Sequence, residues 1–125
     1  MYEVRVTTNF RASHSIRLYG GGMEPAHSHD WHVQAIFRGP ALDEIGVLID
    51  FTLVQRALQE LIVPLLDANL NDTPLLKDVN PTAENLASRL FDALSDVLPT
   101  DAPLAGIEIR EAPGCTAGYW QHEAE

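Results

Sequence analysis

Three histidines, His27, His29 and His32, fall within six positions, and their spacing constrains the fold more than any other feature of the sequence. Side chains on a β-strand alternate between the two faces, so His27 and His29 would share one face and His32 would point to the other. Two imidazoles on one face predict a metal site. The alternative is a polar surface loop whose histidines have no function.

A second strand-like segment, residues 9–14, ends on His14. If it pairs antiparallel with the segment that holds the histidine pair, His14 meets His27 and His29. Three neutral imidazoles with an open fourth position form the ligand set of a catalytic zinc site. The sequence therefore predicts that His14, His27 and His29 bind Zn²⁺.

The segments that carry these histidines have strand composition. Residues 2–10 are rich in β-branched and aromatic residues and predict a first strand that continues to His14, with Phe10 and Ala12 on the same face as His14. The triglycine at 20–22 predicts a mobile connection. A second strand is predicted from Trp31 to Arg38, so that the two strands form a hairpin.

Apolar residues at helical spacing predict two amphipathic helices in the middle of the chain. The first buries a stripe from Leu53 to Leu66, with Asp50 or Thr52 as its cap. Pro64 falls in its last turn and predicts a distortion there. The second helix follows Thr82, a natural N-cap.

Two further strands are predicted at 106–111 and 116–120. Alternation places Ile107 and Ile109 inward and gives Glu111 the same parity at the end of its strand. The order is ββααββ, which predicts an α+β fold with both helices on one face of a four-stranded antiparallel sheet.

Length and composition set limits on function. A chain of 125 residues predicts one domain over 1–125. Its net charge of −10 argues against nucleic acid as a partner. No apolar run reaches the roughly 20 residues of a membrane-spanning helix, which argues against a membrane partner. The single cysteine, Cys115, and the absence of a signal peptide predict a reducing, cytoplasmic location.

Six segments match, in order and spacing, the motifs of one family. They are Phe-Arg-Ala-Ser-His at 10–14, His-Ser-His-Asp-Trp at 27–31, Gly-Val-Leu-Ile-Asp-Phe at 46–51, Leu-Asp and Leu-Asn within 66–71, Pro-Thr-Ala-Glu-Asn-Leu-Ala at 81–87, and Ile-Arg-Glu at 109–111. Nearly end to end, the chain resembles the 6-pyruvoyl-tetrahydropterin and 6-carboxy-tetrahydropterin synthases. These are lyases with the tunnelling fold (T-fold).

The resemblance implies a zinc enzyme that acts on a reduced pterin, either dihydroneopterin or its triphosphate. It implies that His14, His27 and His29 bind the zinc and that Glu111 accepts hydrogen bonds from the pterin 2-amino group and ring N–H. Thr82, in the Pro-Thr-Xaa-Glu-Asn motif, is implied to bind substrate. The resemblance also implies a homo-oligomer, a trimer or hexamer, in which trimers close a barrel and the site lies between subunits.

Two positions depart from the family pattern. Met23 stands near the place of a catalytic cysteine, and Glu24 is the nearest group able to accept a proton, although it is also a plausible solvated loop residue. Ala68 replaces the histidine of a catalytic Asp-His pair, of which Asp67 is retained. We therefore expect altered chemistry, side-chain cleavage or triphosphate elimination, with Glu24 and Asp67 as catalytic candidates. Cys115 is a further candidate base.

Two other functions compete with this prediction. The loss of both proton-transfer groups would also suit an inactive paralogue that binds zinc and a pterin. A cupin-type metalloenzyme is the third candidate, because Gly21 precedes His27 and His29 at the spacing of a cupin motif. Gln34, where that motif has glutamate, and the two amphipathic helices argue against it.

Overall fold

The alternating segments at both ends of the chain form one antiparallel sheet in the computed structural model, which describes residues 1–121. The strands lie side by side in the order β1-β2-β3-β4. Their bounds are β1 Tyr2–His14, β2 His27–Gly39, β3 Leu104–Ala112 and β4 Cys115–Trp120. The predicted four-stranded sheet and the ββααββ order are confirmed.

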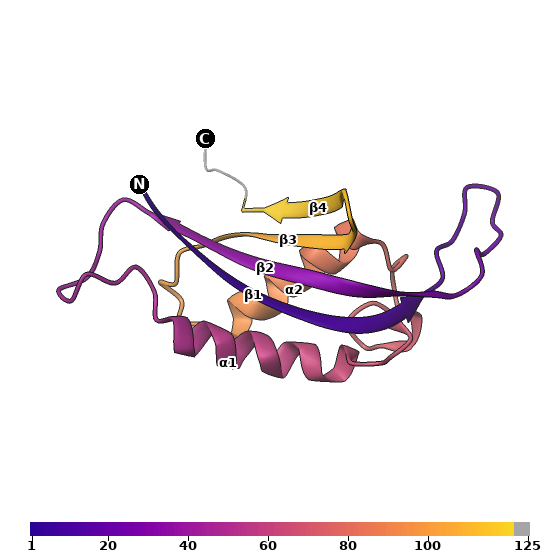
Figure 1. Cartoon of the computed structure of the whole chain (residues 1–125), viewed down its shortest axis with the longest axis horizontal. Helices are drawn as coiled ribbons and strands as arrows, with labels where there is room; N and C mark the ends of the chain where they lie inside the picture. The colour runs from indigo at the N-terminus through magenta and orange to yellow at the C-terminus, as the bar shows by residue number, and fades with distance from the viewer. Residues whose placement is uncertain (122–125) are drawn as a thin grey trace.

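Helices α1 (Phe51–Ile62) and α2 (Ala83–Val97) lie together beneath one face of the sheet (Figure 1). Two short 3₁₀ turns, η1 (Val63–Leu65) and η2 (Leu70–Asp72), connect them. Among residues 1–121, neither helix has the length and apolarity needed to cross a bilayer. Within residues 1–121 the opposite face of the sheet carries no helix, so the described chain has a covered face and a helix-free face.

Side-chain caps fix where the helices begin, as the sequence predicted. The Asp50 carboxylate accepts a hydrogen bond from the Thr52 amide at 2.8 Å, and the Thr82 hydroxyl accepts one from the Asn85 amide at 3.1 Å. Pro64 lies within η1, so the last turn of the first helix tightens to 3₁₀ geometry. All three expectations are confirmed.

The core lies between the sheet and the two helices. From α1 and η1 it takes Val54, Leu58, Ile62 and Leu65, and from β3 it takes Ile107 and Ile109. The predicted stripe was too wide at its ends, because Leu53 is 40% and Leu66 45% exposed. In α1 the side chains that face the sheet repeat about every 3.6 residues from Val54, which leaves Leu53 outside the stripe. Leu66 is exposed because the chain is no longer α-helical after Pro64.

The strand register positions the histidines. β1 pairs antiparallel with β2 so that His14 lies opposite His27 and Ala12 opposite His29. β2 begins at His27, four residues earlier than predicted, because β1 extends along these polar residues and pairs with them. Pairing of β2 with β3 begins only at His32, opposite Arg110. The histidine-bearing end of β2 therefore has no neighbouring strand on the β3 side within the described chain.

Candidate metal centre

The pairing of β1 and β2 brings the three predicted ligands together, as the spacing predicted. The Nε2 atoms of His14 and His27 lie 3.0 Å apart. His29 joins them on the same face, together with a carboxylate oxygen of Glu111, and one ligand atom from each of these four residues lies within 4.8 Å of the others. We call these four residues the metal cluster. His32 points to the helix-free face, as parity predicted.

Backbone carbonyls fix the protonation of two of the imidazoles. The Nδ1 of His14 is 2.8 Å from the Pro81 carbonyl oxygen, and the Nδ1 of His27 is 3.1 Å from that of Pro25. A carbonyl only accepts hydrogen bonds, so each Nδ1 carries the proton and donates it. In the neutral rings both Nε2 atoms then present lone pairs to each other. Such a contact is stable only when a proton or a cation lies between them.

His29 completes the acceptor set. Its Nε2 atom is buried and, within residues 1–121, has no hydrogen-bond partner. The nearest charged atom is an Oε of Glu111 at 3.7 Å. Burial lowers the pKa of His29, and the carboxylate of Glu111 only partly opposes that effect. A neutral imidazole with an orphaned ring nitrogen is the form that binds a metal ion.

The cluster passes a test of fit for a divalent transition metal. Three imidazole nitrogens and one carboxylate oxygen are a donor set found around such ions. Zinc–nitrogen bonds of about 2.0–2.1 Å place tetrahedral ligands roughly 3.3 Å apart, close to the 3.0 Å between His14 and His27. The hydrogen bonds from both Nδ1 atoms are the outer contacts that orient metal-binding histidines.

Trp31 forms the wall behind two of these ligands. Its indole is fully buried, and its Nε1–H donates to the Ala12 carbonyl at 3.1 Å. The ring contacts His14 edge-on with centroids 4.9 Å apart, and His29 with centroids 5.5 Å apart. Phe10 stacks on the indole with centroids 6.4 Å apart. The two edge-on contacts of the indole orient both imidazoles.

Glu111 lies closer to the histidines than the sequence predicted. Parity correctly put it on the covered face at the end of β3, but the sequence did not predict contact with the histidines. One carboxylate oxygen lies 3.0 Å from the Nε2 of His14. The β3–β4 turn begins just beyond it, at Pro113-Gly114, where Gly114 has a positive φ of 84°, a conformation that glycine adopts without strain. Glu111 is thus held at the edge of the cluster.

Glu24 lies beside the metal cluster, as its candidate role requires. Its carboxylate accepts a hydrogen bond from the Ile16 amide at 3.1 Å and lies 3.7 Å from the Nδ1 of His27. The side chain is 27% exposed, so it reaches solvent from a partly enclosed position. Met23, by contrast, is 51% exposed and carries no proton acceptor.

Two asparagines that the sequence did not predict as functional hold the segment on which Glu24 depends. The Asn71 amide group bonds both the N–H and the C=O of Ser15, each at 2.8 Å. The Asn80 amide group bonds both backbone groups of Arg17, at 2.8 and 3.1 Å. We call these contacts the asparagine clamps. A Leu-Asn motif gave the only signal in the sequence, and it did not identify the partner.

Other predicted residues lie outside the cluster. Asp67 is exposed, has a positive φ of 54°, and donates its N–H to the Arg11 carbonyl at the outer edge of β1. Thr82 uses its hydroxyl to cap α2, next to the carbonyl that orients His14. Cys115 is exposed at the start of β4. In residues 1–121 no hydrogen bond or ion pair joins these three side chains to the cluster.

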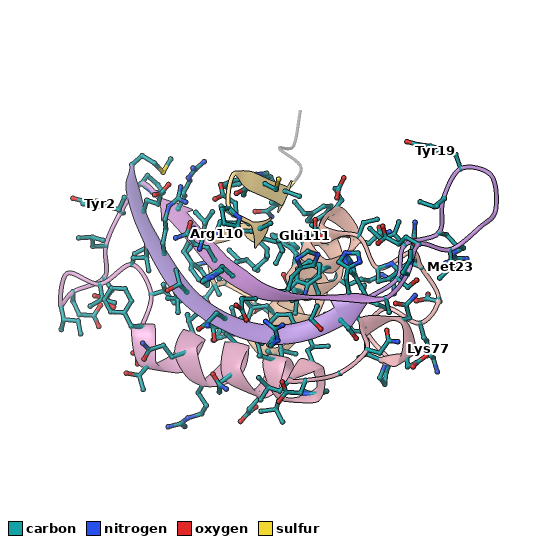
Figure 2. The ribbon with its side chains drawn as sticks, turned by 45° about the vertical axis from the view of Figure 1, so that its right-hand side comes forward. Tyr2, Tyr19, Met23, Lys77, Arg110 and Glu111 are labelled. Atoms are coloured by element: carbon teal, nitrogen blue, oxygen red, sulfur yellow. The ribbon has the colours of Figure 1, made fainter. Side chains whose placement is uncertain are left out.

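A cavity of about 290 Å³ opens beside the cluster, where β2 lacks a strand neighbour. His29 and Glu111 line it from the metal side, and Arg110 lines it from the helix-free face. Figure 2 labels Arg110 and Glu111 at the end of β3 and shows Tyr19 at the far tip of the glycine-rich loop. The cavity gives a small molecule access to the metal cluster.

The sequence model of the 6-pyruvoyl tetrahydropterin synthase family matches residues 3–122. The chain belongs to this family. The 6-pyruvoyl tetrahydrobiopterin synthase of Poecilia reticulata is 33% identical over 101 residues, which cover 72% of this chain and 69% of that protein. The human protein of the same name is 31% identical over 88 residues, which cover 68% of this chain and 61% of that protein.

Solved structures of this family have the same fold. The Caenorhabditis elegans 6-pyruvoyl tetrahydropterin synthase superposes with a TM-score of 0.84 at 18% identity, covering 97% of this chain and 96% of that one. A catalytic-residue variant of the Plasmodium vivax enzyme superposes with a TM-score of 0.78 at 14% identity, covering 98% of both chains. The predicted tunnelling fold is confirmed.

Proposed function

We propose that this protein is a zinc-dependent enzyme acting on a reduced pterin, either dihydroneopterin or its triphosphate. Membership of the synthase family supports the pterin, because relatives from fish to human are named for tetrahydropterin synthesis. We also propose a homo-oligomer, a trimer or hexamer with the site between subunits, and a cytoplasmic location, which the single cysteine supports. Neither nucleic acid nor a membrane is part of this proposal.

The observation that carries the proposal is the set of converging acceptor atoms. Three imidazole Nε2 positions face one another, two of them oriented by carbonyls and the third without a partner in the described chain. We assign Zn²⁺ to His14, His27 and His29, since imidazole nitrogens are its preferred neutral ligands. A zinc ion held by these residues would acidify a substrate hydroxyl and stabilise a developing oxyanion.

Glu24 is proposed as the general base. The Ile16 amide holds its carboxylate beside His27, and from there it would accept a proton from a substrate hydroxyl or C–H at the cluster. In the Plasmodium vivax enzyme, a residue described as catalytic is also a glutamate. A carboxylate base in place of a thiol favours an altered reaction, and we propose side-chain cleavage or triphosphate elimination.

Glu111 and Thr82 are proposed to bind the pterin. The cavity beside the cluster exposes the Glu111 carboxylate, and its two oxygens match the two N–H donors of the pterin 2-amino and ring groups. In this proposal the carboxylate exchanges its contact with His14 for the pterin when zinc occupies the histidines. Thr82 lies next to Pro81, whose carbonyl orients His14.

A second candidate is an inactive paralogue that binds zinc and a pterin without turnover. It is favoured by Ala68 and by the placement of Asp67, whose backbone bonds to the edge of β1 and whose exposed side chain has no imidazole to orient. Under the leading proposal, Asp67 acts without a histidine partner. Both candidates predict binding of zinc and a pterin, but only the enzyme predicts turnover of the pterin.

Incubating zinc-loaded protein with dihydroneopterin triphosphate, and separately with dihydroneopterin, would separate the candidates, with products identified by mass. The enzyme proposal expects a shortened or triphosphate-free pterin, with formation reduced at least a hundredfold in Glu24→Gln. Glu60→Gln on the exposed side of α1 is the matched control and keeps full activity. Unchanged pterin that still binds the protein would favour the inactive paralogue. No binding of zinc or pterin would refute both.

A further inference from the structure

Positive charge is concentrated on the helix-free face of the sheet. The chain has eight Lys and Arg residues against eighteen Asp and Glu, yet on this face the strand residues include more basic than acidic side chains. The basic ones are Arg5, Arg11, Arg38 and Arg110, and the acidic ones are Glu3, Asp30 and Glu108. The charge of this face is therefore more favourable to an anion than the net charge of −10 of the whole chain.

Most of these charges neutralise one another. Glu3 accepts hydrogen bonds from Arg5 and Arg38, at 2.7 and 2.8 Å. Arg5 also lies 3.5 Å from the carboxylate of Glu108. Arg11 pairs with Asp30 at 3.2 Å.

Arg110 stands apart from this network. In residues 1–121 its guanidinium makes no ion pair or side-chain hydrogen bond, so its charge has no counterion. Its cross-strand neighbours are His32 on β2 and Thr116 on β4, and Asn9 on β1 continues the row. The row places an unpaired cation between side chains that can donate hydrogen bonds.

Two cavities meet at Arg110. One, of about 390 Å³, lies on the helix-free face and is lined by Asn9, His32, Arg110 and Thr116 among others. The other is the 290 Å³ cavity beside the metal cluster, which also includes His32 and Arg110. A ligand held at the cluster can therefore extend around the open edge of β2 onto the helix-free face.

We propose that Arg110 and His32, with the hydroxyl of Thr116, form a subsite for phosphate groups. A guanidinium presents a planar fork of N–H donors that matches phosphate oxygens in bidentate fashion, and an unpaired one has that fork available. The phosphates belong either to the side chain of a bound pterin or to a free phosphate ion. The first source rests on the proposed function, whereas the second does not.

The first test titrates inorganic tripolyphosphate into metal-free protein by calorimetry, so that phosphate–metal contacts do not contribute. Replacing a charge-assisted contact predicts binding about tenfold or more weaker in Arg110→Gln. Arg56→Gln, the same charge change on the exposed side of α1, keeps wild-type affinity. The subsite is refuted if Arg110→Gln binds as tightly as wild type, or if wild-type protein binds no tripolyphosphate at millimolar concentration.

The second test distinguishes the sources with zinc-loaded protein and two stable probes, neopterin and neopterin triphosphate. If the phosphates belong to the substrate, neopterin triphosphate binds more tightly than neopterin. Arg110→Gln then removes this difference in affinity and leaves the affinity for neopterin unchanged. If both probes bind equally while tripolyphosphate still depends on Arg110, the subsite takes free phosphate. Failure of neopterin to bind would refute the proposed function and leave the tripolyphosphate result standing.

Discussion

Replacing Trp31 by Phe should weaken both the fold and the metal site, because this indole packs against two of the proposed ligands. The change removes the hydrogen bond from Nε1 to the carbonyl of Ala12, a buried residue near the loop end of the hairpin. It also removes part of the ring that contacts His14 and His29 edge-on. The lost hydrogen bond lowers the stability of the fold, and the lost ring contacts lower metal affinity. The two effects are measured separately.

The cost in stability follows from burial. Trp31 is fully buried and Ala12 is 2% exposed, so the lost hydrogen bond costs about 1–3 kcal/mol. The space left by the smaller ring adds about 1 kcal/mol. A chain of this size loses about 4 °C of melting temperature per kcal/mol. We therefore expect melting in the presence of a chelator to fall by about 8–16 °C at fixed protein concentration.

The cost in metal affinity follows from ligand orientation. Loss of a contact that orients metal-binding histidines typically weakens affinity 10- to 100-fold, and we expect at least tenfold for Co²⁺, followed by its visible absorption. Phe10→Leu is the control, because Phe10 stacks on the indole and, within residues 1–121, has no aromatic contact with the three histidines of the metal cluster. It should lower the melting temperature and leave Co²⁺ affinity unchanged. Equal losses of Co²⁺ affinity in both variants would contradict the orienting role of Trp31.

Three further outcomes are expected. Saturating zinc at 100 times its dissociation constant should stabilise the wild type by about 2.7 kcal/mol in thermal melts and leave His27→Asn unaffected. Asn71→Ala loses two 2.8 Å bonds to the glycine-rich loop, so it should cost about 1–2 kcal/mol in urea denaturation and speed proteolysis there without changing Co²⁺ affinity. Arg5 and Arg38 lower the pKa of Glu3 from its ordinary 4.5, so their contribution to stability is present above about pH 4.5 and is lost as the pH falls through the lowered value. The urea midpoint of Glu3→Gln should therefore lie below that of wild type at pH 7, and the two midpoints should converge at acid pH, below the lowered pKa of Glu3.

The histidine geometry was predictable because it depends on one local rule. Alternation fixed the shared face of His27 and His29, and antiparallel pairing brought His14 opposite His27. The start of β2 was less predictable, since Ser28 and Asp30 have low strand propensity and are strand only because β1 pairs with them.

The parts of the site that the sequence missed depend on long-range register and loop geometry. Contact of Glu111 with His14 requires β3 to stop pairing with β2 at His32, a feature set by the whole sheet. The asparagine clamps join Asn71 and Asn80 to a loop more than fifty residues away in sequence. Neither hydrophobic periodicity nor local turn signals carry information about such pairs.

The three histidines of the metal cluster and Ala68 differ in the contacts that they make. His14 and His29 contact the buried indole, and His14 and His27 also donate to backbone carbonyls, so these imidazoles are held by the fold itself. Ala68, by contrast, is joined to β1 through its backbone, because its carbonyl accepts a hydrogen bond from the Ser13 amide. In residues 1–121 Ala68 is thus neither one of the proposed metal ligands nor a residue that hydrogen-bonds or stacks on one of them. Metal affinity therefore reports the fold of the site and not its activity, which is why only the product assay on Glu24 decides between the two proposed functions.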